Sequence, residues 1–147
     1  MTATFKNAEL EFLYPENWKL QESYASEEIY EVALESPDGC IWSVSVFLDG
    51  SAPTKLTEMC AEALKDQYED FERFDWNGEI AGLESIGFDS NFFCLDFIVA
   101  AQSRAFRLAD KTLNVFCQAE MRDFEKNEQV FEAITTSLIR SLQEADG

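Results

Sequence analysis

Four acidic residues that repeat every four positions are the first candidates for chemistry in this chain of 147 residues. Such spacing places side chains on one face of an α-helix, so that like charges lie one turn apart. Calcium is not expected there, because it needs about six to eight oxygens that converge in space. Two interpretations remain, a solvated acidic face and a docking site for a basic partner. The residues of this predicted partner-binding site are Glu58, Glu62, Asp66 and Asp70.

Aromatic residues at strand ends and in connectors provide a second candidate site. Phe47 alternates out of phase with the apolar residues before it, and Trp76 lies in a polar stretch. Core packing is the default for such side chains, but exposed aromatics supply contact area for a protein partner or a small ligand. We include Phe47 and Trp76 in the predicted partner-binding site, with Phe74 and Phe124 as further candidates.

The chain contains no histidine, and this composition bears directly on catalysis. Histidine is the commonest general base near neutral pH and the commonest metal ligand, so Ser-His-Asp and Cys-His hydrolase sites are excluded within the chain. Asp96 lies in an apolar run, where it is expected either to face solvent or, if it is buried, to pair with Arg104 or Arg107 on a neighbouring strand. A lone carboxylate is weak evidence for acid–base catalysis. We therefore expect a protein that is not an enzyme and has no cofactor and no metal.

The charge balance defines the expected class of partner. The chain has 29 acidic and 11 basic residues, which gives a formal net charge of −18. A field of this sign repels phosphate backbones and anionic membrane surfaces, so neither nucleic acid nor a membrane is expected to bind. The same field attracts basic proteins. We expect a basic protein partner, and a homodimer is a further expectation.

Cysteine spacing and the beginning of the sequence concern the cellular compartment. Cys40, Cys60, Cys94 and Cys117 lie far apart and form no Cys-x-x-Cys pair, so free and mostly buried thiols are expected. The first seven residues contain no apolar signal region, and no apolar run reaches the ~20 residues of a membrane-spanning helix. These features predict a cytoplasmic protein.

Alternation of apolar and polar residues predicts a sheet built mainly from hairpins. The clearest pair of strands, residues 30–34 and 42–48, flanks the turn sequence Pro37-Asp38-Gly39. Residues 21–28 are expected to form a loop or an irregular strand edge, residues 73–78 a connector and residues 89–91 a turn. The other predicted strands are residues 10–14, 80–88, 93–99, 105–108 and 113–119.

Two segments have the helical period. Apolar residues from Leu56 to Phe71 predict a helix in the middle of the chain, and those after Glu125 predict a closing helix. Helices that alternate with runs of hairpin strands favour an α+β fold in which helices cover a mostly antiparallel sheet. The length fits one domain over residues 1–147.

This order of elements carries two groups of residues that resemble the PsbP-like superfamily. That superfamily includes PsbP, the Ran-binding factor Mog, DcrB-type proteins and the Eag chaperones. The resemblance implies an antiparallel sheet sandwiched by helices and a role in protein binding or assembly. A START-like helix-grip fold is the alternative. The matching residues are Phe12, Tyr14, Pro15 and Trp18 near the beginning, and Phe131, Ile134, Ser137 and Leu138 in the last helix.

Two function classes follow from these observations. The first is a non-catalytic protein-binding or chaperone-like accessory factor, which uses its acidic surface for steering and its aromatic side chains for contact. The alternative is a carrier of a small molecule or lipid tail, with a pocket between the sheet and the closing helix.

Overall fold

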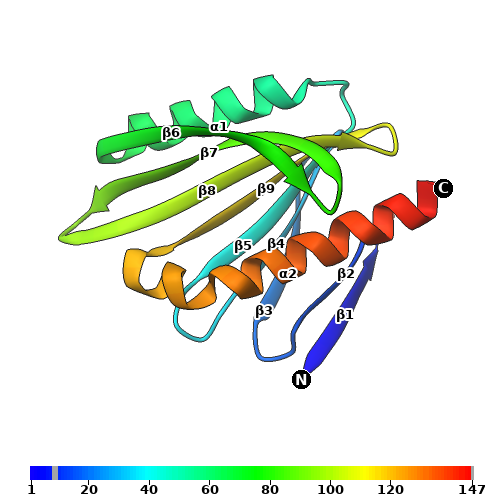
Figure 1. Ribbon diagram of the computed structural model, residues 1–147, viewed down its shortest axis with the longest axis horizontal. Helices are drawn as coiled ribbons and strands as arrows, with labels where there is room; N and C mark the ends of the chain where they lie inside the picture. The colour runs from blue at the N-terminus through cyan, green and yellow to red at the C-terminus, as the bar shows by residue number, and fades with distance from the viewer. Residues whose placement is uncertain (8–9, 147) are drawn as a thin grey trace.

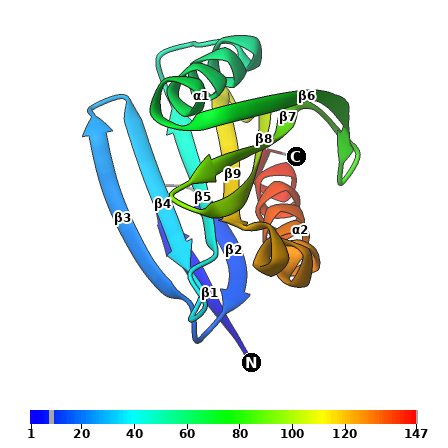
Figure 2. The same cartoon turned by 90° about the vertical axis from the view of Figure 1, so that its left-hand side faces the viewer.

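A seven-stranded antiparallel sheet with a helix on each face forms the centre of the molecule (Figures 1 and 2). The computed structural model describes residues 1–7 and 10–146. The strand order is β3-β4-β5-β9-β8-β7-β6, and β1 and β2 form a separate antiparallel pair. The elements are β1 Thr2–Asn7, β2 Leu10–Pro15, β3 Lys19–Ser26, β4 Ile29–Glu35, β5 Ile41–Phe47, α1 Pro53–Gln67, β6 Glu69–Ile80, β7 Leu83–Cys94, β8 Phe97–Leu108, β9 Lys111–Glu120 and α2 Met121–Asp146.

The predicted mostly antiparallel sheet sandwiched by helices is confirmed. The hairpin expected around Pro37-Asp38-Gly39 is β4–β5, in which Leu34 lies opposite Trp42. Gly39 has a φ of 88°, a left-handed conformation that glycine adopts without steric cost. The hydroxyl of Ser36 donates to the carboxylate of Asp38 and closes the turn.

The larger core lies between the sheet and α2, which we call the α2 face of the sheet. Alternate residues of β4 and β5 point into it, and the β1–β2 pair packs along the same side. The indole Nε1 of Trp42 donates to the hydroxyl of Thr135 on α2 at 3.0 Å, so the largest core side chain is satisfied as well as buried. The other large side chains of this core include Phe12, Leu34, Phe106, Phe131 and Leu138.

A smaller core lies between α1 and the opposite side of the sheet, which we call the α1 face. Leu64 of α1 packs there with Phe88 and Phe92 of β7, and Tyr68 stacks on Phe92 with ring centroids 4.2 Å apart. Polar groups share this face, since the hydroxyl of Ser103 donates to the amide oxygen of Asn114 at 2.7 Å. The α1 face is therefore the more polar of the two.

Three segments that were predicted as irregular are strands. Residues 21–28 largely belong to β3 and residues 73–78 to β6, which are the two edge strands of the main sheet. An edge strand that is exposed on both faces needs no apolar alternation, so its period-two signal is weak. Residues 89–91 lie inside β7, where the hydroxyl of Ser90 donates to the carbonyl of Ala101.

The expected helix ends and two expected strands also differ from the structure. The strand expected over residues 80–88 is interrupted by a turn, because β6 ends at Ile80 and β7 begins at Leu83. The middle helix ends at Gln67 instead of Phe71, and the closing helix begins at Met121, before Glu125. The segment at residues 93–99 is not a continuous strand, because β7 ends at Cys94 and β8 begins at Phe97. β1 was not predicted.

Candidate functional site

The predicted acidic stripe is divided between two elements. Glu58, Glu62 and Asp66 lie on α1, whereas Asp70 lies on β6 with a φ of 55°, beside a shift in the strand register. The expectation that all four share one helix face is therefore wrong. The acidic residues of α1 and β6 nevertheless lie near each other, because Glu58 on α1 is paired with a β6 residue, Arg73.

The pair between Glu58 and Arg73 joins α1 to β6. The two guanidinium nitrogens Nη1 and Nη2 donate to the two carboxylate oxygens at 2.8 and 2.7 Å, a bidentate arrangement. The Arg73 Nε donates to Asp75 at 2.7 Å. Hydrogen bonding to Arg73 lowers the pKa of Glu58 below its ordinary value. Glu58 is therefore a structural partner of Arg73 as well as a surface charge.

The two predicted aromatic site residues are not brought together. Phe47 is half-buried at the end of β5 and Trp76 is half-buried on β6, with β9, β8 and β7 between their strands. Phe124 is buried in the core, whereas Phe74 is 52% exposed. A single patch made of these aromatics does not exist.

The most exposed cluster of large apolar side chains is the end of the β7–β8 hairpin, which sequence reasoning missed. We call residues 93–98 the hairpin tip. It projects beyond the neighbouring elements in Figure 1, and Phe93 lies opposite Ile98 across the two strands. The exposed apolar residues are Phe93 at 41%, Leu95 at 89%, Phe97 at 54% and Ile98 at 44%.

Leu95 occupies an unfavourable backbone conformation at the turn of this tip. Its φ is 58°, in the left-handed region that favours glycine and costs about 1–2 kcal/mol for an ordinary residue. The sequence contains neither Gly nor Pro at this turn, so the apolar run looked like one strand. The same turn exposes Asp96, which is the solvent-facing alternative expected for it, and Arg104 pairs with Asp89 instead.

Acidic side chains border the hairpin tip. Asp96 is exposed at the turn itself, and Glu69 at the beginning of β6 lies opposite Phe93. Glu120 at the end of β9 lies opposite Val99, just beyond the tip. An apolar surface with an acidic border matches a partner surface that is apolar at its centre and basic at its rim.

Arg104 forms a second notable arrangement, on the α2 face of the sheet. Its guanidinium carbon lies 4.0 Å from the centroid of the Trp76 ring, and the group donates to the carbonyls of Phe88 and Ser103 at 3.2 and 3.0 Å. The guanidinium also forms an ion pair with Asp89, in which Nη2 donates to the carboxylate Oδ1 at 2.7 Å. Gly87 lies opposite both Trp76 and Arg104 in the sheet. Because it has no side chain, the guanidinium can reach the ring across β7.

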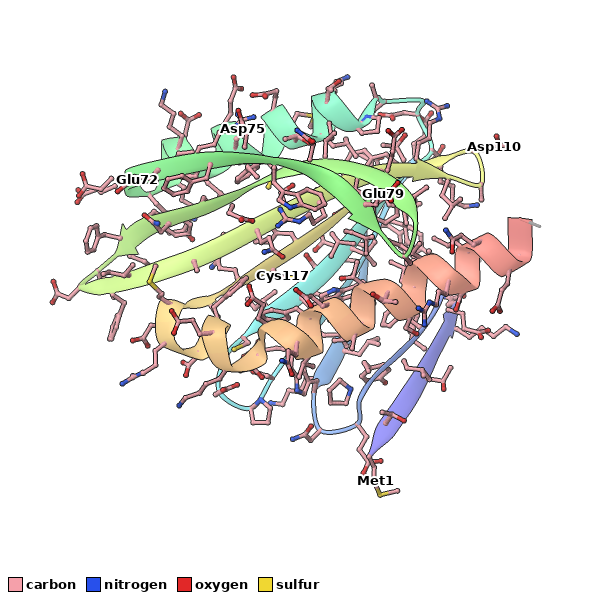
Figure 3. The ribbon with its side chains drawn as sticks, viewed as in Figure 1. Met1, Glu72, Asp75, Glu79, Asp110 and Cys117 are labelled. Atoms are coloured by element: carbon pink, nitrogen blue, oxygen red, sulfur yellow. The ribbon has the colours of Figure 1, made fainter. Side chains whose placement is uncertain are left out.

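A pocket of about 370 Å³ lies beside this arrangement, between the sheet and α2. Trp76 and Arg104 line one wall, and Phe131 and Thr135 of α2 line the other. Cys117 on β9 also lines it (Figure 3), and burial raises the pKa of its thiol, so the thiol stays protonated and is a weak nucleophile. The pocket position matches the one expected for a small-molecule carrier.

Within residues 1–7 and 10–146, no three acidic or cysteine side chains converge as they would around a metal ion. The expectation that no metal is bound stays a prediction. All four cysteines are free thiols, as predicted, with Cys40 and Cys117 buried. None of the helices in the described part of the chain is long and apolar enough to cross a membrane.

Comparisons with known proteins identify the fold. No family model and no curated protein matches the sequence. The chain is similar to the solved structure of cyanobacterial PsbP (CyanoP) from Synechocystis, with 14% sequence identity over 92% of this chain and 90% of that chain and a TM-score of 0.67. It is also similar to a Pseudomonas aeruginosa protein of unknown function, with 13% identity over 93% and 95% of the two chains and a TM-score of 0.56.

These similarities establish a PsbP-like fold for the chain, as the resemblance in the sequence implied. They concern the fold alone, because sequence identities of 13% and 14% do not carry a function from one chain to another. The START-like alternative is not needed. The functional argument therefore depends on the geometry of this chain.

Proposed function

We propose that the protein is a non-catalytic accessory factor that binds a basic protein partner through the hairpin tip. The observation that carries this proposal is the clustering of Phe93, Leu95, Phe97 and Ile98 on one projecting hairpin. Contiguous exposed apolar side chains bordered by polar ones are typical of protein-binding sites. The acidic border and the net charge of −18 steer a basic partner toward the tip.

The geometry of the tip suits binding in a partner's pocket. Phe93 and Ile98 belong to paired strands, so their positions are fixed before binding and little ordering entropy is lost. Leu95 at the turn is the most exposed of the four and is the natural anchor. A leucine held at a positive φ where glycine is favoured indicates that the side chain itself serves a purpose.

The first experiment is capture of partners from a lysate of the native host by the whole protein and by two variants. In the tip variant Leu95→Ser and Phe97→Ser, exposed apolar side chains become polar, so folding is expected to persist. The control variant Leu48→Ser and Met59→Ser makes the same type of change at 55% and 50% exposed residues elsewhere. We expect a discrete partner with wild type and control that is lost with the tip variant.

Two results would oppose this proposal. A partner retained equally by the tip variant would exclude the tip as its site. A wild-type dimer that becomes a monomer only in the tip variant, measured by sedimentation, would show that a second copy of the chain occupies the tip in place of a basic partner.

A second candidate function is favoured by the pocket beside Trp76 and Arg104. Its volume of about 370 Å³ lies within the range of small-ligand sites, about 300–1,000 Å³, and it combines an aromatic ring with a cation. A carrier of a small molecule would be stabilised thermally by its ligand, and this stabilisation would be lost in Trp76→Leu. Screening a panel of apolar and carboxylate-bearing ligands separates this function from the first, because the tip variant would retain the stabilisation.

A further inference from the structure

We infer that the outer edge of β6 binds an extended basic segment of the partner as an additional strand of the sheet. This inference rests on the proposed function and extends it from the hairpin tip to a second, adjacent contact. The two surfaces are continuous, because Glu69 at the beginning of β6 lies opposite Phe93 of the tip.

The backbone of β6 is available for such pairing. β6 is the last strand in the sheet order, so only β7 pairs with it, and seven of its twelve residues are exposed. An edge strand presents a row of N–H and C=O groups without strand partners, which is a template for an added strand. The register is regular from Glu72 to Ile80, after the shift near Glu69, and this stretch defines the length of the segment.

The charge of β6 selects the partner. The strand carries five acidic residues and one basic residue, and Arg73 is already paired with Glu58 and Asp75. Figure 3 shows Glu72, Asp75 and Glu79 spread along the strand. This charge opposes pairing with the β6 of a second copy, which would place like charges together, and it favours lysine and arginine.

The two sides of β6 indicate the side-chain pattern of the segment. On the α1 side, a groove of about 360 Å³ is lined by Phe71 and by the charged side chains of Glu58, Glu62, Lys65 and Arg73. Strand alternation places the carboxylates of Asp75 and Glu79 on the same side of β6 as Arg73. On the α2 side, Phe74 is 52% exposed and Trp76 is half-buried. Side chains of an added strand alternate between these sides. Basic residues of the segment therefore face the carboxylates of Asp75 and Glu79, and apolar residues face the two aromatic rings.

The opposite edge of the sheet differs in this respect. On β3, Glu22 accepts hydrogen bonds from the side chains of Asn7 and Tyr30, so β1 and β4 already engage its carboxylate. The large exposed apolar side chain of β3 is Tyr24, which packs on Tyr30 with ring centroids 4.9 Å apart. β6 is therefore the edge on which acidic charge, aromatic contact and open backbone coincide.

The test uses the full chain and an octapeptide of alternating lysine and valine with blocked ends. We expect binding that weakens with salt and that protects backbone amides of residues 72–80 from hydrogen exchange, measured by NMR. The same peptide with N-methylated central residues keeps its charge but loses its hydrogen bonds, so it should not protect these amides. The variant Glu72→Gln, Asp75→Asn and Glu79→Gln should bind about fivefold more weakly, since Asp75 and Glu79 face the lysines and two exposed pairs contribute about 0.5 kcal/mol each, whereas Glu72 lies on the other side of the strand.

A matched control removes three exposed acidic residues from the other end of the sheet. The variant Glu27→Gln, Glu28→Gln and Glu35→Gln has the same net charge as the β6 variant and should bind nearly as well as wild type. Equal weakening by both variants, equal binding of the N-methylated peptide, or protection confined to β3 would overturn the inference.

The outcomes also separate this inference from the proposed function. Leu95→Ser and Phe97→Ser should leave octapeptide binding unchanged, because the peptide contacts β6 and not the tip. If the octapeptide fails to protect β6 while a host partner still requires the tip, the inference fails and the proposed function stands. If the octapeptide protects β6 while no partner requires the tip, the inference stands and the tip assignment fails.

Discussion

The two faces of the main sheet differ in composition, although each is covered by one helix. The α2 face is lined by large apolar side chains and closes a core that extends from Phe5 to Leu142. The α1 face has a smaller core around Phe88 and Phe92, and it includes a hydroxyl–amide pair between Ser103 and Asn114. The α2 face thus contributes most of the buried apolar core that stabilises the fold, whereas the α1 face borders the surfaces that we propose for binding.

This difference indicates how the chain divides stability and recognition. A face packed with apolar side chains loses several kcal/mol when one of them is truncated, whereas a mixed face tolerates change. Both proposed contacts, the hairpin tip and the β6 edge, lie at the side of the sheet where α1 packs on β6, β7 and β8. Variation of the binding surface is therefore separated from the larger core.

The largest expected effect tests this difference directly. Leu138 on α2 is fully buried in the larger core, and Leu64 on α1 is 7% exposed at the smaller one. We expect Leu138→Ala to lower the free energy of unfolding by about 2–5 kcal/mol, and Leu64→Ala by an amount near the lower limit, because the cavity at the smaller core collapses more easily. Urea denaturation of both variants measures this. Equal losses would show that the two faces contribute alike.

The next effect concerns the contact between strands that holds Arg104 in place. A Cβ at Gly87 would lie 1.8 Å from the backbone oxygen of Ser103, so β7 and β8 must separate locally in Gly87→Ala. We expect a loss of about 1–3 kcal/mol and a weaker stack of Arg104 on Trp76. Trp76 fluorescence and urea denaturation report both changes. A variant as stable as wild type would show that the strands adjust without cost.

The fold was predictable where the sequence pattern follows burial. The β4–β5 hairpin and both helices were found, because each buries one side and shows the corresponding period. β3 and β6 were missed because edge strands exposed on both faces carry mostly polar residues. The end of α1 was misplaced because Phe71 continues the apolar period of the helix although it belongs to β6.

The candidate site was less predictable than the fold. The acidic spacing found Glu58 and Glu62, but it gave no information that Arg73 pairs with Glu58 or that Asp70 belongs to a strand. The hairpin tip was hidden because Leu95 forms a turn without glycine. Trp76 was selected because it lies in a polar stretch, yet its contact with Arg104 crosses β7 and depends on strand order, which the sequence does not specify.

A third prediction compares one thiol from each face of the sheet, Cys117 and Cys60, through the effect of pH on stability. Burial raises the pKa of Cys117 in the larger core. Burial also raises the pKa of Cys60 on α1, but hydrogen bonds with Ser103 and Asn114 oppose that rise. In the unfolded chain a thiol loses its proton near pH 8.5. The unfolded state therefore binds fewer protons above that pH, and stability falls as pH rises.

We expect Cys117→Ala to flatten this alkaline loss of stability more than Cys60→Ala does. Urea denaturation between about pH 8 and 10 measures the slopes. Tyr30, whose pKa is also raised by burial, contributes only near and above about pH 10, where tyrosine loses its proton in the unfolded chain. A slope unchanged by Cys117→Ala would mean that the thiol ionises as easily in the folded chain as in the unfolded one.

The smallest effect separates two acidic residues that are neighbours on α1. Glu62 lies between Glu58 and Asp66 at helical spacing, so Glu62→Gln removes two like-charge pairs, although it also removes the attraction to Lys65 one turn later. The net stabilisation should be about 0.2–0.5 kcal/mol at low salt. Glu58→Gln should have the opposite sign, because it breaks the bidentate pair with Arg73. The lowered pKa of Glu58 means that the stabilisation by its pair with Arg73 is present at neutral pH and is lost as pH falls through the folded pKa.

Thermal unfolding of both variants at two salt concentrations, with Arg73→Gln to complete a double-mutant cycle, measures the difference between Glu58 and Glu62. Stabilisation by both changes would show that the pair with Arg73 contributes nothing and that α1 carries only a solvated acidic face.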